Sequence, residues 1–118
     1  MGGLAGKSFS AADDVRTFDK GRMEVVHLGR ATVGRATFDP GWKWSECVKP
    51  VAGTDSCQVE HLGYVVSGRM HVVMDDGTEA DAGPGDVVVI DAGHDAWIVG
   101  GEPCVFVDFN GASNYAKR

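Results

Sequence analysis

The chain has 118 residues, of which 43% are hydrophobic, and its formal net charge is −6. This length is enough for one domain with a core of its own. The acidic balance argues against a nucleic-acid partner, because binding to phosphates requires clustered Lys and Arg. No run of about 18 apolar residues is present, which excludes a membrane-spanning helix. The N-terminal segment lacks the apolar core of a signal peptide, which favours a cytoplasmic protein.

The N-terminal part of the chain changes from polar to apolar after about residue 20. Residues 1–20 are polar and irregular, with one helical turn expected around residues 11–16. Alternating or continuous apolar residues then predict strands, at residues 23–28, 31–38 and 42–48. Between the last two, Asp-Pro-Gly at residues 39–41 predicts a turn, since proline fixes one dihedral angle and glycine accepts the left-handed one.

The C-terminal half continues the pattern of short strands after a loop at residues 49–57. Asp75-Asp76-Gly77 has the Asp-Gly signature of a type I′ hairpin turn. Short strands at a spacing of about 8–12 residues, with no long helix, predict an all-β sandwich or barrel. We expect a single domain over residues 1–118, with a barrel core at about residues 22–109 and polar tails. The predicted strands lie at residues 58–66, 69–74, 78–82, 87–90, 96–99 and 104–109.

Two stretches resemble the motifs of the cupin superfamily. The first is GYVVSGRMHVVMDDG at residues 63–77, and the second is AGPGDVVVIDAGHDAW at residues 82–97. The resemblance covers about residues 38–109. It implies a double-stranded β-helix, which is the jelly-roll barrel of the cupins. The superfamily includes dioxygenases, isomerases, epimerases, decarboxylases and sugar-binding regulators, so the fold alone does not choose a function.

The resemblance also implies a divalent metal in the barrel, because cupin metal sites typically use three histidines and one glutamate. In the first motif, Pro-Gly is followed by five residues and then the first ligand. His61 takes the place of the glutamate, seven positions before a glycine. The second motif ends at the position of the family's fourth metal ligand. The four positions of this chain that match the family's ligands are Cys47, Lys49, His61 and Ala96.

Strand alternation predicts which side chains point into the barrel. If His61 and Ala96 point inward, so does His94, and one wall carries both histidines with Cys47 and Lys49. A mostly apolar cavity with a few converging polar groups is the usual form of a small-molecule site. We therefore expect a small-molecule pocket that includes Lys49, Ser45 and Met70. The expected apolar interior consists of Val65, Met70, Val72, Ile98 and Phe106.

His61, His94 and Cys47 are the predicted metal ligands, and zinc or ferrous iron suits imidazole and thiolate best. His61 is also a candidate catalytic base. Each residue has a structural alternative: His61 as a core histidine bonded to a backbone carbonyl, His94 as a turn cap, and Cys47 as a small buried thiol. Cys57 is expected to be structural, because four residues of strand at about 3.3 Å each would separate it too far from His61 for one ion.

These residues predict a small-molecule-binding cupin that holds a divalent metal. Whether it is an enzyme stays open; if it is, oxygenase, isomerase or lyase chemistry is expected. The alternative is a metal-free ligand-binding or sensory cupin, in which Lys49 neutralises a bound anion. A metal-free enzyme with His61 as general base is a third hypothesis. We also expect a homodimer, with Trp42, Trp44 and Trp97 facing outward at its interface; core packing is the competing interpretation of these tryptophans.

Overall fold

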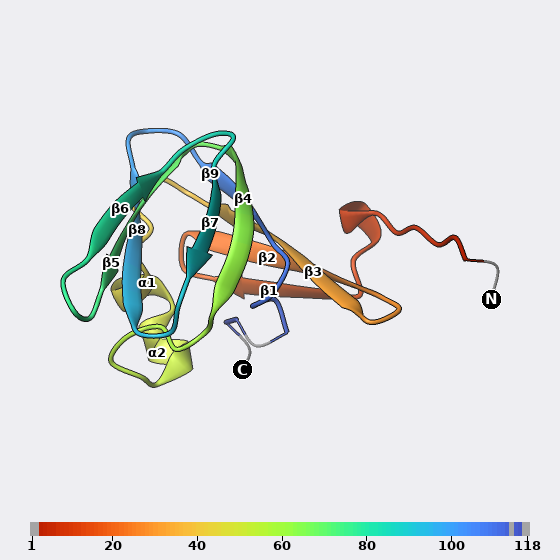
Figure 1. Cartoon of the computed structure of the whole chain (residues 1–118), viewed down its shortest axis with the longest axis horizontal. Coiled ribbons are helices and arrows are strands. Elements are labelled where there is room, and N and C mark those ends of the chain that lie inside the picture. Colours follow the sequence, from red (N-terminus) through yellow and green to blue (C-terminus); the bar gives the residue numbers. More distant parts are fainter. Residues whose placement is uncertain (1–2, 114, 117–118) are drawn as a thin grey trace.

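The computed structural model describes residues 3–113 and 115–116. Within these residues, antiparallel strands form two sheets that pack against each other (Figure 1). The larger sheet has the order β1 (Asp14–Phe18), β2 (Gly21–Leu28), β3 (Ala31–Phe38), β9 (Cys104–Asp108), β4 (His61–Ser67) and β7 (Val87–Ile90). The smaller sheet has the order β6 (Glu79–Ala82), β5 (Arg69–Met74) and β8 (His94–Val99).

The helical elements are short. They are the 3₁₀ turn η1 (Phe9–Ala11), α1 (Trp44–Cys47) and α2 (Lys49–Ala52). The strand predicted at residues 42–48 is wrong, because the chain turns into α1 at Trp44. From there on the buried residues, Trp44, Cys47 and Val48, follow the helical spacing i, i+3, i+4. No helix in the described part of the chain is long and apolar enough to span a membrane.

The sheet begins earlier than the sequence indicates. The helical turn expected at residues 11–16 is wrong for residues 14–16, which belong to β1 (Asp14–Phe18) and pair with β2. In this strand Arg16 and Phe18 are buried on one face. A buried arginine breaks the apolar alternation, so the strand pattern of this segment is hard to recognise.

The hairpin between β5 and β6 turns where the sequence predicts, with a different turn type. Gly77 has φ +93°, and its amide donates to the carbonyl of Met74 at 2.9 Å. A type I′ turn needs positive φ at both central residues. Among the described non-glycine residues only Lys20 and Ala116 have positive φ, so Asp76 cannot be a central residue of that turn, and the predicted Asp76–Gly77 type I′ turn is wrong.

The core between the sheets contains the side chains that alternation placed inside. Val65, Met70, Val72, Ile98 and Phe106 are all buried, as predicted.

Aromatic rings occupy one side of this core. Trp42 and Trp44 are each only 2% exposed, and the rings of Phe38 and Trp42 lie 4.1 Å apart. Core packing is therefore the right interpretation of these two tryptophans, and the prediction that they face outward is wrong. The expected homodimer loses this support and stays a prediction.

The C-terminal segment folds back onto the larger sheet (Figure 1). The guanidinium of Arg16, a buried side chain of β1, donates hydrogen bonds to the backbone carbonyls of Ala112, Ser113 and Tyr115. Tyr115 is thereby held in the core, where its ring lies 6.0 Å from that of Phe18. The packed structure extends beyond residues 22–109 at both ends.

We expect Arg16→Met to destabilise the chain by about 2 kcal/mol, because it leaves several buried carbonyls without their charged donor. The amide of Tyr115, which donates to Gly111, should then exchange with solvent faster. Urea denaturation and hydrogen exchange measure the two effects. Arg35→Met is the matched control: Arg35 pairs with Glu24 at a partly exposed site, where an ion pair contributes at most about 1 kcal/mol. Equal losses of stability in both variants would contradict the stabilising role of the Arg16 hydrogen bonds.

Candidate functional site

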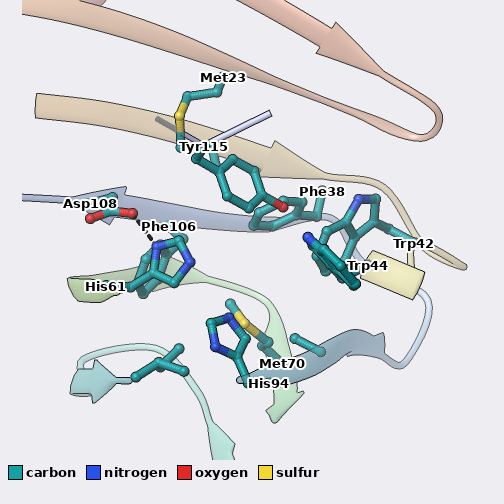
Figure 2. A pocket seen from close by; sticks show the side chains of 13 residues that line it. Met23, Phe38, Trp42, Trp44, His61, Met70, His94, Phe106, Asp108 and Tyr115 are labelled. Carbon is teal, nitrogen blue, oxygen red and sulfur yellow. Dashed lines mark hydrogen bonds and ion pairs between the residues drawn. The ribbon is translucent and has the colours of Figure 1, made fainter. Parts of the chain in front are cut away.

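A small cavity lies inside the barrel between the two sheets (Figure 2). Its volume is about 30 Å³, and its wall is mostly apolar. The polar side chains at this wall come from strands of both sheets: His61 begins β4, His94 begins β8, and Asp108 ends β9. The full lining is Met23, Ala36, Phe38, Trp42, Trp44, His61, Met70, Ile90, His94, Ala96, Phe106, Asp108 and Tyr115.

His61 is held by a buried carboxylate. Its Nδ1 lies 2.5 Å from Oδ2 of Asp108, whose other oxygen accepts hydrogen bonds from the amides of Asn110 and Gly111. Burial acts to raise the pKa of Asp108, but the hydrogen bond from His61 and the two amides together hold it below its ordinary value. Asp108 is therefore ionised at neutral pH and can only accept hydrogen bonds.

This pairing fixes the orientation of His61. Since Asp108 is an acceptor, Nδ1 of His61 carries the donated hydrogen, and the neutral ring presents a lone pair on Nε2. A carboxylate behind a histidine in this manner is the usual support of a metal-ligating imidazole. Sequence reasoning missed Asp108, although alternation in CVFVDF places it on the same face as Cys104 and Phe106.

His94 is oriented by the turn before it. Its Nδ1 donates to the backbone carbonyl of Asp91 at 2.7 Å, which leaves Nε2 with the lone pair. The ring is 3% exposed, and this burial lowers the pKa of His94, so the ring is neutral at neutral pH. Its centre lies 5.3 Å from that of His61. The structure thus brings the two predicted histidines together.

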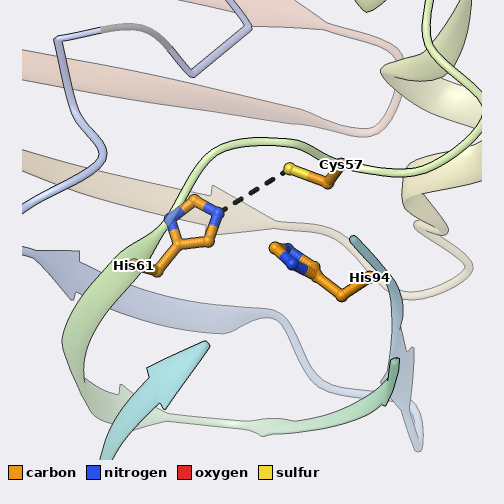
Figure 3. A group of neighbouring side chains, drawn as sticks. All are labelled: Cys57, His61 and His94. Atoms are coloured by element: carbon orange, nitrogen blue, oxygen red, sulfur yellow. Dashed lines mark hydrogen bonds between the residues drawn. The ribbon is translucent and has the colours of Figure 1, made fainter. Parts of the chain in front are cut away.

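The third group beside the histidines is Cys57 (Figure 3). Its thiol donates toward Nε2 of His61 at 3.9 Å. One ligand atom each from Cys57, His61 and His94 all lie within 4.8 Å of one another, and all three residues are buried. Burial raises the pKa of the Cys57 thiol to about 11, so the free thiol is protonated. A bound metal ion would deprotonate it.

The prediction that Cys57 is too far from His61 is wrong, and the reason is the backbone. The strand expected at residues 58–66 begins only at His61. Cys57 instead forms a separate bridge to His94, with amide–carbonyl bonds of 2.7 and 3.2 Å. The chain between Cys57 and His61 is not an extended strand. The two residues therefore lie closer together than four residues at about 3.3 Å each would place them.

The other predicted site residues lie in different places. Met70 lines the cavity, as expected. Cys47 is on α1, and its thiol donates to Asp19 at 3.8 Å instead of joining the histidines. Lys49 begins α2 with a side chain that is 42% exposed and lies 3.9 Å from Asp55. Ser45 bonds through its backbone amide to Asp95. Helix formation at residues 44–52 turns these three residues away from the wall that a strand would have built.

The donor set fits a divalent metal. Two imidazole nitrogens and a thiol are the ligands that zinc and ferrous iron accept. Each histidine is held through Nδ1 by an acceptor, so both Nε2 atoms are available. Within the described residues, Cys57, His61 and His94 form the one group of three or more His, Cys, Asp or Glu side chains whose ligand atoms converge. The two histidines also line the cavity, so an ion there would face it.

Comparison with solved structures shows the same architecture in several proteins. The polyketide cyclase RemF from Streptomyces resistomycificus has a TM-score of 0.64 and 17% identity, over 92% of this chain and 80% of that one. KdgF from Halomonas sp. has a TM-score of 0.55 and 23% identity, over 78% of this chain and 79% of that one.

An oxalate decarboxylase from Lactobacillus farciminis has a TM-score of 0.62 and 20% identity over 86% of this chain. The match covers 32% of the decarboxylase, so this chain spans about a third of that protein's length. At these identities the likenesses show the fold alone. No curated protein matches the chain. The family model of the cupin domain matches residues 47–110, more than half of the 118 residues. The chain therefore belongs to the cupin family and folds as a cupin jelly-roll barrel.

Proposed function

We propose that this cupin binds a divalent metal ion through His61, His94 and Cys57 and acts with it on a small molecule in the barrel. The observation that carries the proposal is the convergence of one ring nitrogen from each histidine and the Cys57 thiol within 4.8 Å, with both histidines at the wall of the cavity. A metal held by three protein ligands keeps an open position and supplies a Lewis acid that polarises an oxygen of the bound molecule. Zinc and ferrous iron are the favoured ions.

Catalysis is the finer part of this proposal. The names of two fold neighbours, an oxalate decarboxylase and a polyketide cyclase, support enzymatic chemistry in barrels of this shape. In this chain, Asp108 would hold the orientation of His61, and the apolar wall would exclude bulk water from the bound molecule. Oxygenase, isomerase and lyase chemistry all remain within the proposal.

The metal is tested on protein purified without chelator and then reconstituted with zinc or, without oxygen, with ferrous iron. Elemental analysis should find about one equivalent per chain, as expected for a single site. His94→Ala and Cys57→Ser should lose most of it. Cys47→Ser is the matched control, because Cys47 is an equally buried thiol outside the group. Less than about a tenth of an equivalent in the reconstituted wild-type protein would overturn the metal proposal.

A metal-free function is the second candidate, and the His61–Asp108 hydrogen bond favours it. A histidine that is oriented by a carboxylate is a common general base. The version in which Lys49 neutralises an anion in the barrel has less support, since Lys49 lies outside the cavity lining. Activity or ligand binding that persists undiminished in EDTA would favour the metal-free function.

A further inference from the structure

Two side chains that line the cavity each carry a buried polar atom with no hydrogen-bond partner within the described residues. The two atoms are Nε1 of Trp42 and the hydroxyl oxygen of Tyr115. Both side chains are almost fully buried, with exposed fractions of 2% and 3%, and both line the cavity. A buried donor without a partner costs free energy, so native structures rarely keep one unless something satisfies it. The two atoms therefore point to a ligand that supplies acceptors.

The two donors are placed on the side of the cavity next to the aromatic cluster. The Tyr115 ring lies 5.4 Å from that of His61, and the Trp42 ring packs 4.1 Å from Phe38. In Figure 2 the hydroxyl of Tyr115 points away from Asp108 toward the side of Phe38 and the tryptophans. Burial raises the pKa of Tyr115 well above its ordinary value, so the hydroxyl keeps its proton and can donate it.

The rest of the wall restricts the kind of ligand. No Lys or Arg occurs among the described residues that line the cavity, so the protein itself offers a carboxylate or phosphate no countercharge beside the ionised Asp108. Flat aromatic surfaces favour a flat apolar ligand. The rings at the wall, besides the histidines, belong to Phe38, Trp42, Trp44, Phe106 and Tyr115.

We propose that Trp42 and Tyr115 are specificity residues that donate hydrogen bonds to the carbonyl or hydroxyl oxygen of a small, neutral aromatic ligand. This inference rests on the proposed function in that the ligand occupies the same cavity that the metal group faces. Trp42 Nε1 can only donate, which requires an acceptor on the ligand, whereas the Tyr115 hydroxyl both donates and accepts.

Room for such a ligand comes from a second cavity next to the first. It has a volume of about 180 Å³, and Trp44 and Tyr115 line both cavities. The first cavity, at about 30 Å³, has room for only a water or two. A shift of the Tyr115 ring would join the two spaces. Tyr115 is carried by the C-terminal segment that Arg16 holds, so this segment would move with it.

The test uses three probes of similar size: acetophenone with a carbonyl oxygen, ethylbenzene with none, and benzoate with a charge. Their dissociation constants are measured by NMR titration of the full chain, once with EDTA and once with zinc. In EDTA we expect acetophenone to bind about tenfold more tightly than the other two, because only it satisfies the buried donors without burying a charge. With zinc, which can offset the charge of benzoate, the expected preference is that of acetophenone over ethylbenzene. Tyr115→Phe and Trp42→Phe should each remove most of this preference and leave the affinity for ethylbenzene within about twofold.

Tyr64→Phe and Trp97→Phe are the matched controls, since these side chains do not line the cavity. They should leave the preference unchanged. Tyr115→Phe should also be at least as stable as the wild-type protein, because the hydroxyl that it removes has no partner. This readout separates loss of recognition from loss of folding.

The proposal is overturned if acetophenone shows no preference over ethylbenzene, or if the preference survives in Tyr115→Phe and Trp42→Phe. Zinc binding without a preference for acetophenone would reject this inference and keep the metal. A preference that persists in EDTA, in protein that binds no zinc, would support this inference and reject the metal.

Discussion

Asp108→Asn is expected to weaken zinc binding by about 10–100-fold, because Asp108 supports the imidazole of a metal ligand. The asparagine oxygen can still accept from the amides of Asn110 and Gly111, so the turn after β9 is retained. Its amide nitrogen would then face Nδ1 of His61 as a second donor. The imidazole relieves this conflict by moving its hydrogen to Nε2, which removes the lone pair that the metal requires.

Competition with a chromophoric chelator measures this change in zinc affinity. Asp86→Asn is the matched control, since Asp86 accepts from the amide of Gly83 in a turn away from the metal group. A zinc affinity within twofold of the wild-type value in Asp108→Asn would argue against His61 as a ligand.

Asp108→Ala has a second expected effect, on stability. It removes a fully buried carboxylate and leaves three donors without their partner: Nδ1 of His61 and the amides of Asn110 and Gly111. Each buried donor that loses its acceptor costs about 1–3 kcal/mol. Urea denaturation should therefore show a lower midpoint for Asp108→Ala than for Asp108→Asn, and equal midpoints would contradict this account of the network.

The sequence was sufficient to predict the barrel and the two histidines. Short apolar runs separated by glycine turns predicted most of the strands, and two-residue alternation placed His61 and His94 inside. Alternation works there because the backbone of β4 and β8 is regular where these residues lie. The two histidines meet because β4 and β8 lie in different sheets of the same closed barrel.

The identity of the third group could not be predicted, because it depends on irregular backbone. A strand at residues 42–48 predicts Cys47 inside the barrel, but helix formation rotates its thiol toward Asp19. Cys57 was excluded by a strand length that does not exist before His61. In both cases the geometry of an extended strand predicts the wrong place for the side chain, because the backbone there is not extended.

The cavity donors illustrate a different limit. Tyr115 lies in a polar C-terminal segment without periodicity, and contacts with distant residues, among them the hydrogen bond from Arg16 of β1, hold it in the core. The two residues are 99 positions apart. A contact between such distant segments depends on the tertiary structure, and no local pattern encodes it. The prediction of Trp42 at the surface follows from alternation along the strand expected at residues 42–48, which does not form.

Gly68→Ala is expected to lower the free energy of unfolding by about 3 kcal/mol or more. Gly68 joins β4 to β5 with φ +77°, a conformation that costs an L-residue about 1 kcal/mol or more. An added Cβ would also lie 2.5 Å from Cα of Cys104, and it would approach the carbonyl oxygen of Pro103 still more closely. These are backbone atoms, so relief requires a shift of the chain where β9 begins, and overpacking of this kind adds about 1–3 kcal/mol.

Gly77→Ala separates the two contributions. Gly77 has φ +93°, but no atom outside its chain neighbours lies within 4 Å of its added Cβ. Its cost should therefore be the dihedral strain alone, about 1 kcal/mol. Urea denaturation of both variants measures the difference, and equal losses would show that the contact with β9 is relieved without strain.

The position of Gly68 also connects its substitution to the metal group. The shifted strand β9 runs from Cys104 to Asp108, and Asp108 holds His61. Gly68→Ala should therefore weaken zinc binding as well as stability. Gly77→Ala should leave zinc affinity within about twofold of the wild-type value, since its added Cβ meets no atom within 4 Å that would have to move. Zinc affinity is measured on the folded fraction below the thermal transition. An unchanged affinity in Gly68→Ala would mean that the start of β9 yields without moving Asp108.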